Sequence, residues 1–98
     1  MKVYRANIKV KENALNPHNC SHIVNSASNL AVYEGKIKYN GKEVDIQSIL
    51  GLLSLAPLEF EADVQVTIAT IEGLNREEAI GLFADLEIGE VTNVYRVI

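Results

Sequence analysis

The sequence predicts an α+β domain in which an antiparallel sheet is covered on one face by helices. Several segments alternate apolar and polar residues, as half-exposed strands do, and two longer segments carry apolar residues at helical spacing. An Asn40-Gly41 pair between two of the alternating segments marks a tight hairpin. In chain order the pattern is strand, helix, strand, strand, short helix, strand and helix, followed by one more apolar segment.

The first strand and the first helix are separated by a loop. Residues 3–10 alternate and predict a half-exposed strand, and residues 11–17 form the loop. Apolar residues at helical spacing predict a helix over residues 19–31. Many residues of this helix are poor helix formers, so we expect packing to hold it in place.

A tight hairpin follows the first helix. Residues 32–39 predict the next strand. Asn40 and Gly41 favour the positive φ angles of a type I′ turn, so residues 36–39 are expected to pair with residues 43–46.

A short helix is expected directly after the hairpin, because the apolar period changes there from two to the helical one. Its apolar face is formed by Ile49, Leu52 and Leu53, with Leu50 close to it. Ser48 stands at its start and could accept a hydrogen bond as the N-cap, a contribution of about 1 kcal/mol. Asp45 is the alternative cap.

A long strand, a long helix and a final strand complete the chain. Residues 60–71 alternate and predict the clearest strand. Asn75 is a favourable N-cap for the helix that follows, and Gly89 is expected to stop it. The buried stripe of this helix comprises Ala79, Ile80, Leu82, Phe83 and Leu86. Residues 91–98 predict either an edge strand of the same sheet or a strand that pairs with a partner, including a homodimer formed through Val91 to Ile98.

Composition narrows the possible functions. The 98 residues, 48% apolar, fit one domain, and no segment has the length of a membrane span or the form of a signal peptide, so a cytoplasmic protein is expected. Cys20 is the only cysteine and has only His18 and His22 near it, which argues against a disulfide and a metal site. No cofactor is expected. The net charge of −4 and the dispersed basic residues argue against nucleic-acid binding.

The hairpin and the short helix carry a resemblance to a known family. The segments Gln47-Ser48-Ile49-Leu50-Gly51 and Leu53-Ser54-Leu55, then the late strand and Glu72-Gly73-Leu74-Asn75 with the acidic helix start behind it, resemble the HPr family, the histidine-containing phosphocarriers of the bacterial sugar phosphotransferase system. The resemblance implies an open-faced sandwich of four strands with three helices on one face. Residues 1–88 would form this core, and residues 89–98 would add a strand that the typical member lacks.

The same resemblance implies two functional positions. In the family, an ATP-dependent kinase phosphorylates the serine that matches Ser48, and the short helix behind it docks partner proteins. The phosphoryl group itself is carried on a histidine at the start of the first helix, within a Gly-hydrophobic-His-Ala-Arg-Pro-Ala type of motif. Helix-start N–H groups and the arginine would balance the phosphate charge.

The phosphocarrier motif is not preserved in the matching segment, residues 14–21. Aligned by the apolar positions of the helix, Asn16 falls on the phosphorylated histidine and His18 on the arginine. Counted from the first strand, Pro17 falls on the histidine, and His18 reaches it only if the loop gains one residue and the helix loses two. Cys20, in the first turn, is either a reactive thiol or a small buried hydrophobe.

These observations support two hypotheses. In the first, the chain is a regulatory or protein-binding module without a phosphorylatable histidine, controlled at Ser48. Its docking face would consist of Ile49, Leu50 and Leu53, with Cys20 and Ser21 from the first helix. In the second, it is an active phosphocarrier that accepts phosphate on His18 from enzyme I and passes it to sugar-transport components. In both, the partners implied by the resemblance are enzyme I, a serine kinase or a regulator, and the chain is a carrier or regulator rather than a true enzyme.

Overall fold

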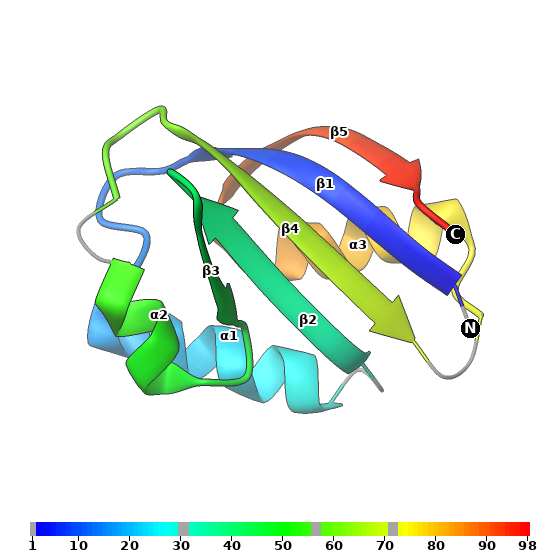
Figure 1. The fold of residues 1–98 in the computed structure, drawn as a ribbon, viewed down its shortest axis with the longest axis horizontal. Helices are drawn as coiled ribbons and strands as arrows, with labels where there is room; N and C mark the ends of the chain where they lie inside the picture. The colour runs from blue at the N-terminus through cyan, green and yellow to red at the C-terminus, as the bar shows by residue number, and fades with distance from the viewer. Residues whose placement is uncertain (1, 30–31, 56–57, 71–72) are drawn as a thin grey trace.

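The computed structural model describes residues 2–29, 32–55, 58–70 and 73–98 and shows one sheet with three helices (Figure 1). The elements, in chain order, are β1 (Lys2–Val10), α1 (Pro17–Asn29), β2 (Val32–Tyr39), β3 (Lys42–Asp45), α2 (Ile49–Leu55), β4 (Asp63–Thr70), α3 (Arg76–Asp85) and β5 (Gly89–Arg96). Within these described ranges, no helix has the length and apolar character needed to cross a membrane.

The sheet is antiparallel throughout, with the strand order β3-β2-β4-β1-β5. β1 lies between β4 and β5, and Ala6 pairs with Val66 on one side and with Val94 on the other. The last strand therefore extends the sheet at the free edge of β1, and the start of β1 and the end of β5 lie side by side (Figure 1). This architecture confirms the predicted open-faced α+β sandwich with an additional C-terminal strand.

The hydrophobic core lies on one face of the sheet, because alternate side chains of each strand point to that face. The buried strand residues include Tyr4, Ala6, Ile8 and Val10 of β1 and Val64, Val66 and Ile68 of β4. The helices contribute Ile23 and Ala27 of α1, Leu52 and Leu55 of α2, and Ala79, Leu82 and Phe83 of α3. Figure 1 shows α1 and α3 behind the strands, and the opposite, open face carries partly exposed polar side chains such as Arg5 and Thr67.

The hairpin forms as predicted. Asn40 and Gly41 have φ angles of 54° and 82°, and β2 pairs with β3 across them. The third strand begins one residue earlier than expected, at Lys42. The first helix also begins earlier, at Pro17 rather than at residue 19, because Asn16 caps it; residues 30–31 of the predicted helix lie outside the described ranges.

The predicted strand over residues 60–71 is too long at its start. β4 begins at Asp63, and Phe60 and Glu61 form a turn in which Glu61 has a φ of 65°. The turn is bound to the end of β1, since Glu61 N–H donates to the Val10 carbonyl oxygen and Val10 N–H donates to the Ala62 carbonyl oxygen. Alternation alone does not reveal a turn that is set by a neighbouring strand.

The last helix is capped as predicted. The Asn75 side chain accepts from Glu78 N–H at 2.8 Å, and the Glu78 carboxylate accepts from Asn75 N–H at 3.2 Å, which is a capping box. The helix ends at Asp85, and the chain reverses through Glu87, whose φ is 55°. Gly89 is already the first residue of β5, so the final strand begins two residues before the predicted start.

Two glycines near this reversal make a matched pair for a stability test. A Cβ at Gly89 would overlap the Lys9 carbonyl and lie 2.8 Å from Lys11 N, whereas a Cβ at Gly81 in α3 meets nothing within 4 Å. We expect Gly89→Ala to lower the free energy of unfolding by about 1–3 kcal/mol and Gly81→Ala to raise it by about 0.5–1 kcal/mol. Urea denaturation of the two variants measures both changes, and equal effects would contradict the close approach of β1 and β5 at Gly89.

Candidate functional site

The start of α1 is organised by Asn16. Its Oδ1 accepts from Asn19 N–H at 2.8 Å, its carbonyl oxygen accepts from Cys20 N–H at 2.9 Å, and its Nδ2 donates to the Asn13 carbonyl oxygen at 3.0 Å. These bonds make Asn16 the N-cap and place Pro17 at the first helical position, where the missing N–H of proline has no cost. Both ends of the Asn16 amide are therefore used by the local backbone.

The two histidines of α1 have different surroundings. His18 is exposed at the second helical position. His22 Nε2 lies 2.6 Å from the Asp85 carbonyl oxygen and 3.3 Å from the Glu87 carboxylate. His22 thus connects α1 to the end of α3. No group of three histidine, cysteine or acidic side chains that could hold a metal occurs in the described part of the chain.

Asn19 is a buried polar residue that the sequence analysis did not single out. Its Nδ2 donates to the Ala14 carbonyl oxygen at 2.6 Å and to the Glu87 carbonyl oxygen at 3.1 Å. One side chain therefore holds the loop before α1 and the turn after α3 against the first turn of α1. The only signal in the sequence is an amide residue in a segment of poor helix formers, which does not identify its partners.

Cys20 does not belong to an exposed surface. Its side chain is fully buried, and this burial raises the pKa of the thiol. The structure therefore corrects the expectation that Cys20 contributes to a docking face, and it favours the small buried hydrophobe over the reactive thiol. Ser21, its neighbour, is partly exposed.

Ser48 caps α2. Its Oγ accepts from Gly51 N–H at 3.0 Å, and its carbonyl oxygen accepts from Leu52 N–H at 2.9 Å. Asp45 has a different role, since its Oδ1 accepts from Gln47 N–H at 2.8 Å within the turn that precedes the helix. The Ser48 side chain remains partly exposed.

The apolar residues of α2 divide between the core and the solvent. Leu52 and Leu55 are buried, whereas Leu50 is 82% exposed, Ile49 is 41% exposed and Leu53 is partly buried. Ile49 was expected on the same face as Leu52, and the structure corrects this. α2 packs against α1, and the beginning of α1 lies beside it in Figure 1. The exposed residues Ile49 and Leu50, with the edge of Leu53, are called the α2 patch below.

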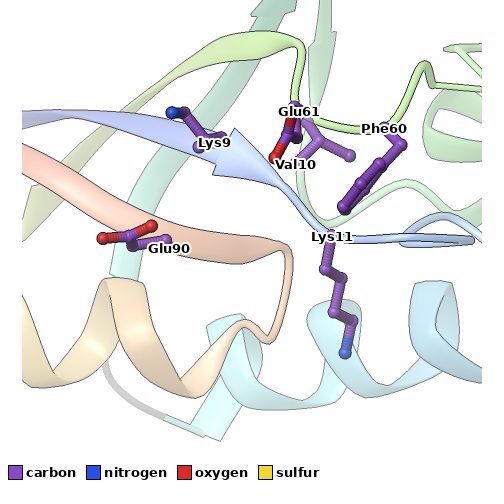
Figure 2. A pocket seen from close by; sticks show the side chains of 6 residues that line it. All are labelled: Lys9, Val10, Lys11, Phe60, Glu61 and Glu90. Carbon is purple, nitrogen blue, oxygen red and sulfur yellow. The ribbon is translucent and has the colours of Figure 1, made fainter.

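A small hollow of about 240 Å³ lies elsewhere, between the end of β1, the start of β5 and the turn before β4. Figure 2 shows the Phe60 ring on one side of the chain at Lys11, and Glu90 on β5. Its two lysines and two glutamates balance in formal charge, and none of its lining residues is among the predicted site residues. This hollow is therefore not part of the α1 and α2 site.

Of three comparisons with known proteins, only the one with solved structures found matches. No protein-family model matches the sequence, and no curated protein matches it. The phosphocarrier protein HPr from Bacillus anthracis str. Ames is 27% identical, with a TM-score of 0.66 over 85% of this chain and 95% of that chain. HPr-C-His from Thermoanaerobacter tengcongensis is 26% identical, with a TM-score of 0.66 over 85% of this chain and 89% of that chain.

The fold and these similarities define the class. The chain has an HPr-like fold and is similar to bacterial phosphocarrier proteins of that name. The four strands β3-β2-β4-β1 and the three helices are the elements that the sequence resemblance implied, and β5 is the additional one.

The role of Asn19 can be tested by truncation. Asn19→Ala removes the donor to Ala14 and Glu87, so we expect the free energy of unfolding to fall by about 1–3 kcal/mol. Asn25→Ala, at an exposed position of the same helix, is the control and should change it by no more than about 0.7 kcal/mol, since alanine favours the helix. Chemical denaturation compares the two, and equal values would show that the Asn19 bridge has no net effect.

Proposed function

We propose that this chain is an HPr-like protein of a bacterial phosphotransferase system that acts as a regulatory, protein-binding module. In this proposal it carries no phosphoryl group on histidine, binds a partner protein through the α2 patch and the start of α1, and is controlled by phosphorylation of Ser48. The observation that carries the proposal is the position of Asn16 as the N-cap of α1, the place where the resemblance, aligned by the apolar positions of the helix, expects the phosphorylated histidine.

The chemistry of an amide supports the loss of phosphotransfer. An imidazole nitrogen has a free lone pair that can attack phosphorus, whereas the lone pair of an amide nitrogen is delocalised into the carbonyl. The Asn16 amide is also engaged at both ends, with Asn19 N–H and the Asn13 carbonyl. His18 lies two residues further on, exposed on the first turn, and no arginine occurs in residues 11–29.

The exposure of α2 supports protein binding. Isolated exposed leucines are ordinary, but Leu50 and Ile49 are adjacent on a seven-residue helix next to the start of α1. Adjacent exposed apolar side chains on one turn of a helix can bind in a hydrophobic groove of a partner protein. Its partners would be other proteins of the phosphotransferase system, within the cytoplasm.

The position of Ser48 supports regulation at this patch. Ser48 is partly exposed and directly precedes Ile49 and Leu50, so a phosphate there would add about −1.5 to −2 charges beside the apolar residues. The phosphate would also replace the capping hydroxyl that now binds Gly51 N–H. Asp45 lies three residues before Ser48 and would repel the phosphate, which favours a change in partner affinity over a new fixed contact.

The loss of phosphotransfer is tested with enzyme I and phosphoenolpyruvate, using an HPr phosphocarrier as the positive control. We expect no acid-labile phosphate on the wild-type chain by intact-mass analysis, and the same result for His18→Ala. Asn16→His supplies an imidazole at the helix start and is expected to become phosphorylated slowly, because the compensating arginine is absent. Phosphate on the wild type that disappears in His18→Ala would instead establish the active phosphocarrier.

The regulatory site is tested with an ATP-dependent HPr serine kinase and by partner binding. We expect an acid-stable phosphate on the wild type that is lost in Ser48→Ala and kept in Ser54→Ala, a change on the same helix. Ser48→Asp should weaken the binding of a partner captured through the α2 patch by at least about tenfold, whereas Ser54→Asp should change it less. If Ser48→Asp binds every partner as the wild type does, the regulatory proposal fails.

A further inference from the structure

The two edges of the sheet differ in how they are protected. β3, at one edge, has four residues, includes Lys42 and Glu43, and packs against α2. β5, at the other edge, has eight residues, packs against α3 and, among the described strands, pairs with β1 alone. Natural sheets keep exposed edges short, charged or covered because unpaired backbone groups bind other strands. β5 is the longer of the two edge strands, so it departs further from the first condition, which is a short edge.

The backbone groups that face outward on β5 follow from its bond to β1. Val97 N–H donates to the Val3 carbonyl oxygen at 2.8 Å. Because hydrogen-bonded residues alternate along an antiparallel strand, the N–H groups of Tyr95 and Asn93 also face β1, and those of Val94 and Arg96 face away from it. A register shift opposite Asn7 and Ile8 interrupts this alternation, so the regular outer edge is the segment from residue 93 onward.

Apolar side chains are concentrated on this same segment. Tyr95 is 36% exposed, Val97 is 40% exposed and Ile98 is 71% exposed. Val3 and Ala69 continue the strip across the open face of the sheet, because Val3 pairs with Ala69 on β4 and accepts from Val97 N–H. The strip therefore runs up to the free edge and stops there.

We propose that the outer edge of β5, from Asn93 to Ile98, pairs antiparallel with the same edge of a second copy of this chain. A two-fold axis at Tyr95 would place Val94 opposite Arg96 of the second copy in two hydrogen-bonded pairs. Tyr95 would then lie opposite Tyr95 of the second copy at a non-hydrogen-bonded site, where cross-strand side chains come closest. Asn93 would lie opposite Val97 of the second copy.

The β5 edge of a second copy fits this edge better than the β3 edge of a second copy does. The two-fold arrangement sets no charge directly opposite a like charge, and it joins the two apolar strips across one continuous sheet. Arg96 is the one charged residue of the segment, and its Nε already donates to the Ile98 carbonyl oxygen at 2.6 Å. β3 of another copy offers a strand of four residues, against the eight of β5, and so fewer backbone hydrogen bonds. The inference does not depend on the proposed function of the α2 patch.

The test is the concentration dependence of the mass of the full chain, measured by sedimentation equilibrium between about 10 µM and 1 mM. We expect the wild type to pass from monomer to dimer in this range. Arg96→Pro removes an N–H that the chain's own ladder does not use, and edge strands tolerate proline at such positions. It should raise the dissociation constant roughly 30-fold, whereas Arg96→Ala, which keeps the N–H, should raise it less than about threefold.

Amide hydrogen exchange on the wild type supplies a second measurement that needs no variant. The Val94 and Arg96 amides should exchange more slowly as the protein concentration rises, while the exposed Asn40 amide should not change. A chain that stays monomeric over the whole range would overturn the proposal. A dimer that Arg96→Pro leaves intact, or that slows exchange at α2 instead of β5, would overturn it as well.

Discussion

The structure depends on β1, which is paired on both sides and supplies one buried side chain in every two residues. Tyr4, Ala6, Ile8 and Val10 all point into the core, and burying a side chain such as Ile8 contributes about 1.5–3 kcal/mol. The end of the strand is fixed by backbone bonds to two other segments, from Val10 to the turn before β4 and from Lys11 to Ile88 before β5. The loop that leads to α1 therefore begins at a fixed point.

That fixed point determines where the first helix can begin. Asn19 binds the loop at Ala14 and the turn at Glu87, and Asn16 then closes the first turn through its own side chain and backbone. A residue whose amide oxygen caps the helix and whose amide nitrogen donates to the Asn13 carbonyl oxygen has little freedom to act on a ligand. Under the proposed function, this is the position whose side chain separates a binding module from a carrier.

Local patterns were enough for most elements and not for the site. The strand alternation, the Asn40-Gly41 turn and the Asn75 cap act within a few residues, and the structure contains all three. The partners of Asn19 lie at positions 14 and 87 and are brought together only by the tertiary fold. The short helix α2 carries apolar residues around most of its circumference. The helical spacing of apolar residues therefore could not show that Ile49 is exposed to solvent and that Leu55 is buried in the core.

The two exposed apolar surfaces lie at opposite edges of the sheet. α2 packs against β3 at one edge and leaves Ile49 and Leu50 exposed; at the other edge, where α3 packs against β5, Val97 and Ile98 are exposed. Four strand spacings of about 4.8 Å separate the two edges, about 19 Å in total. A dimer built on β5 would therefore carry its two α2 patches at the far ends of a continuous sheet. Partner binding at α2 and self-association at β5 would not compete for the same residues, so a phosphate on Ser48 could change the first without affecting the second.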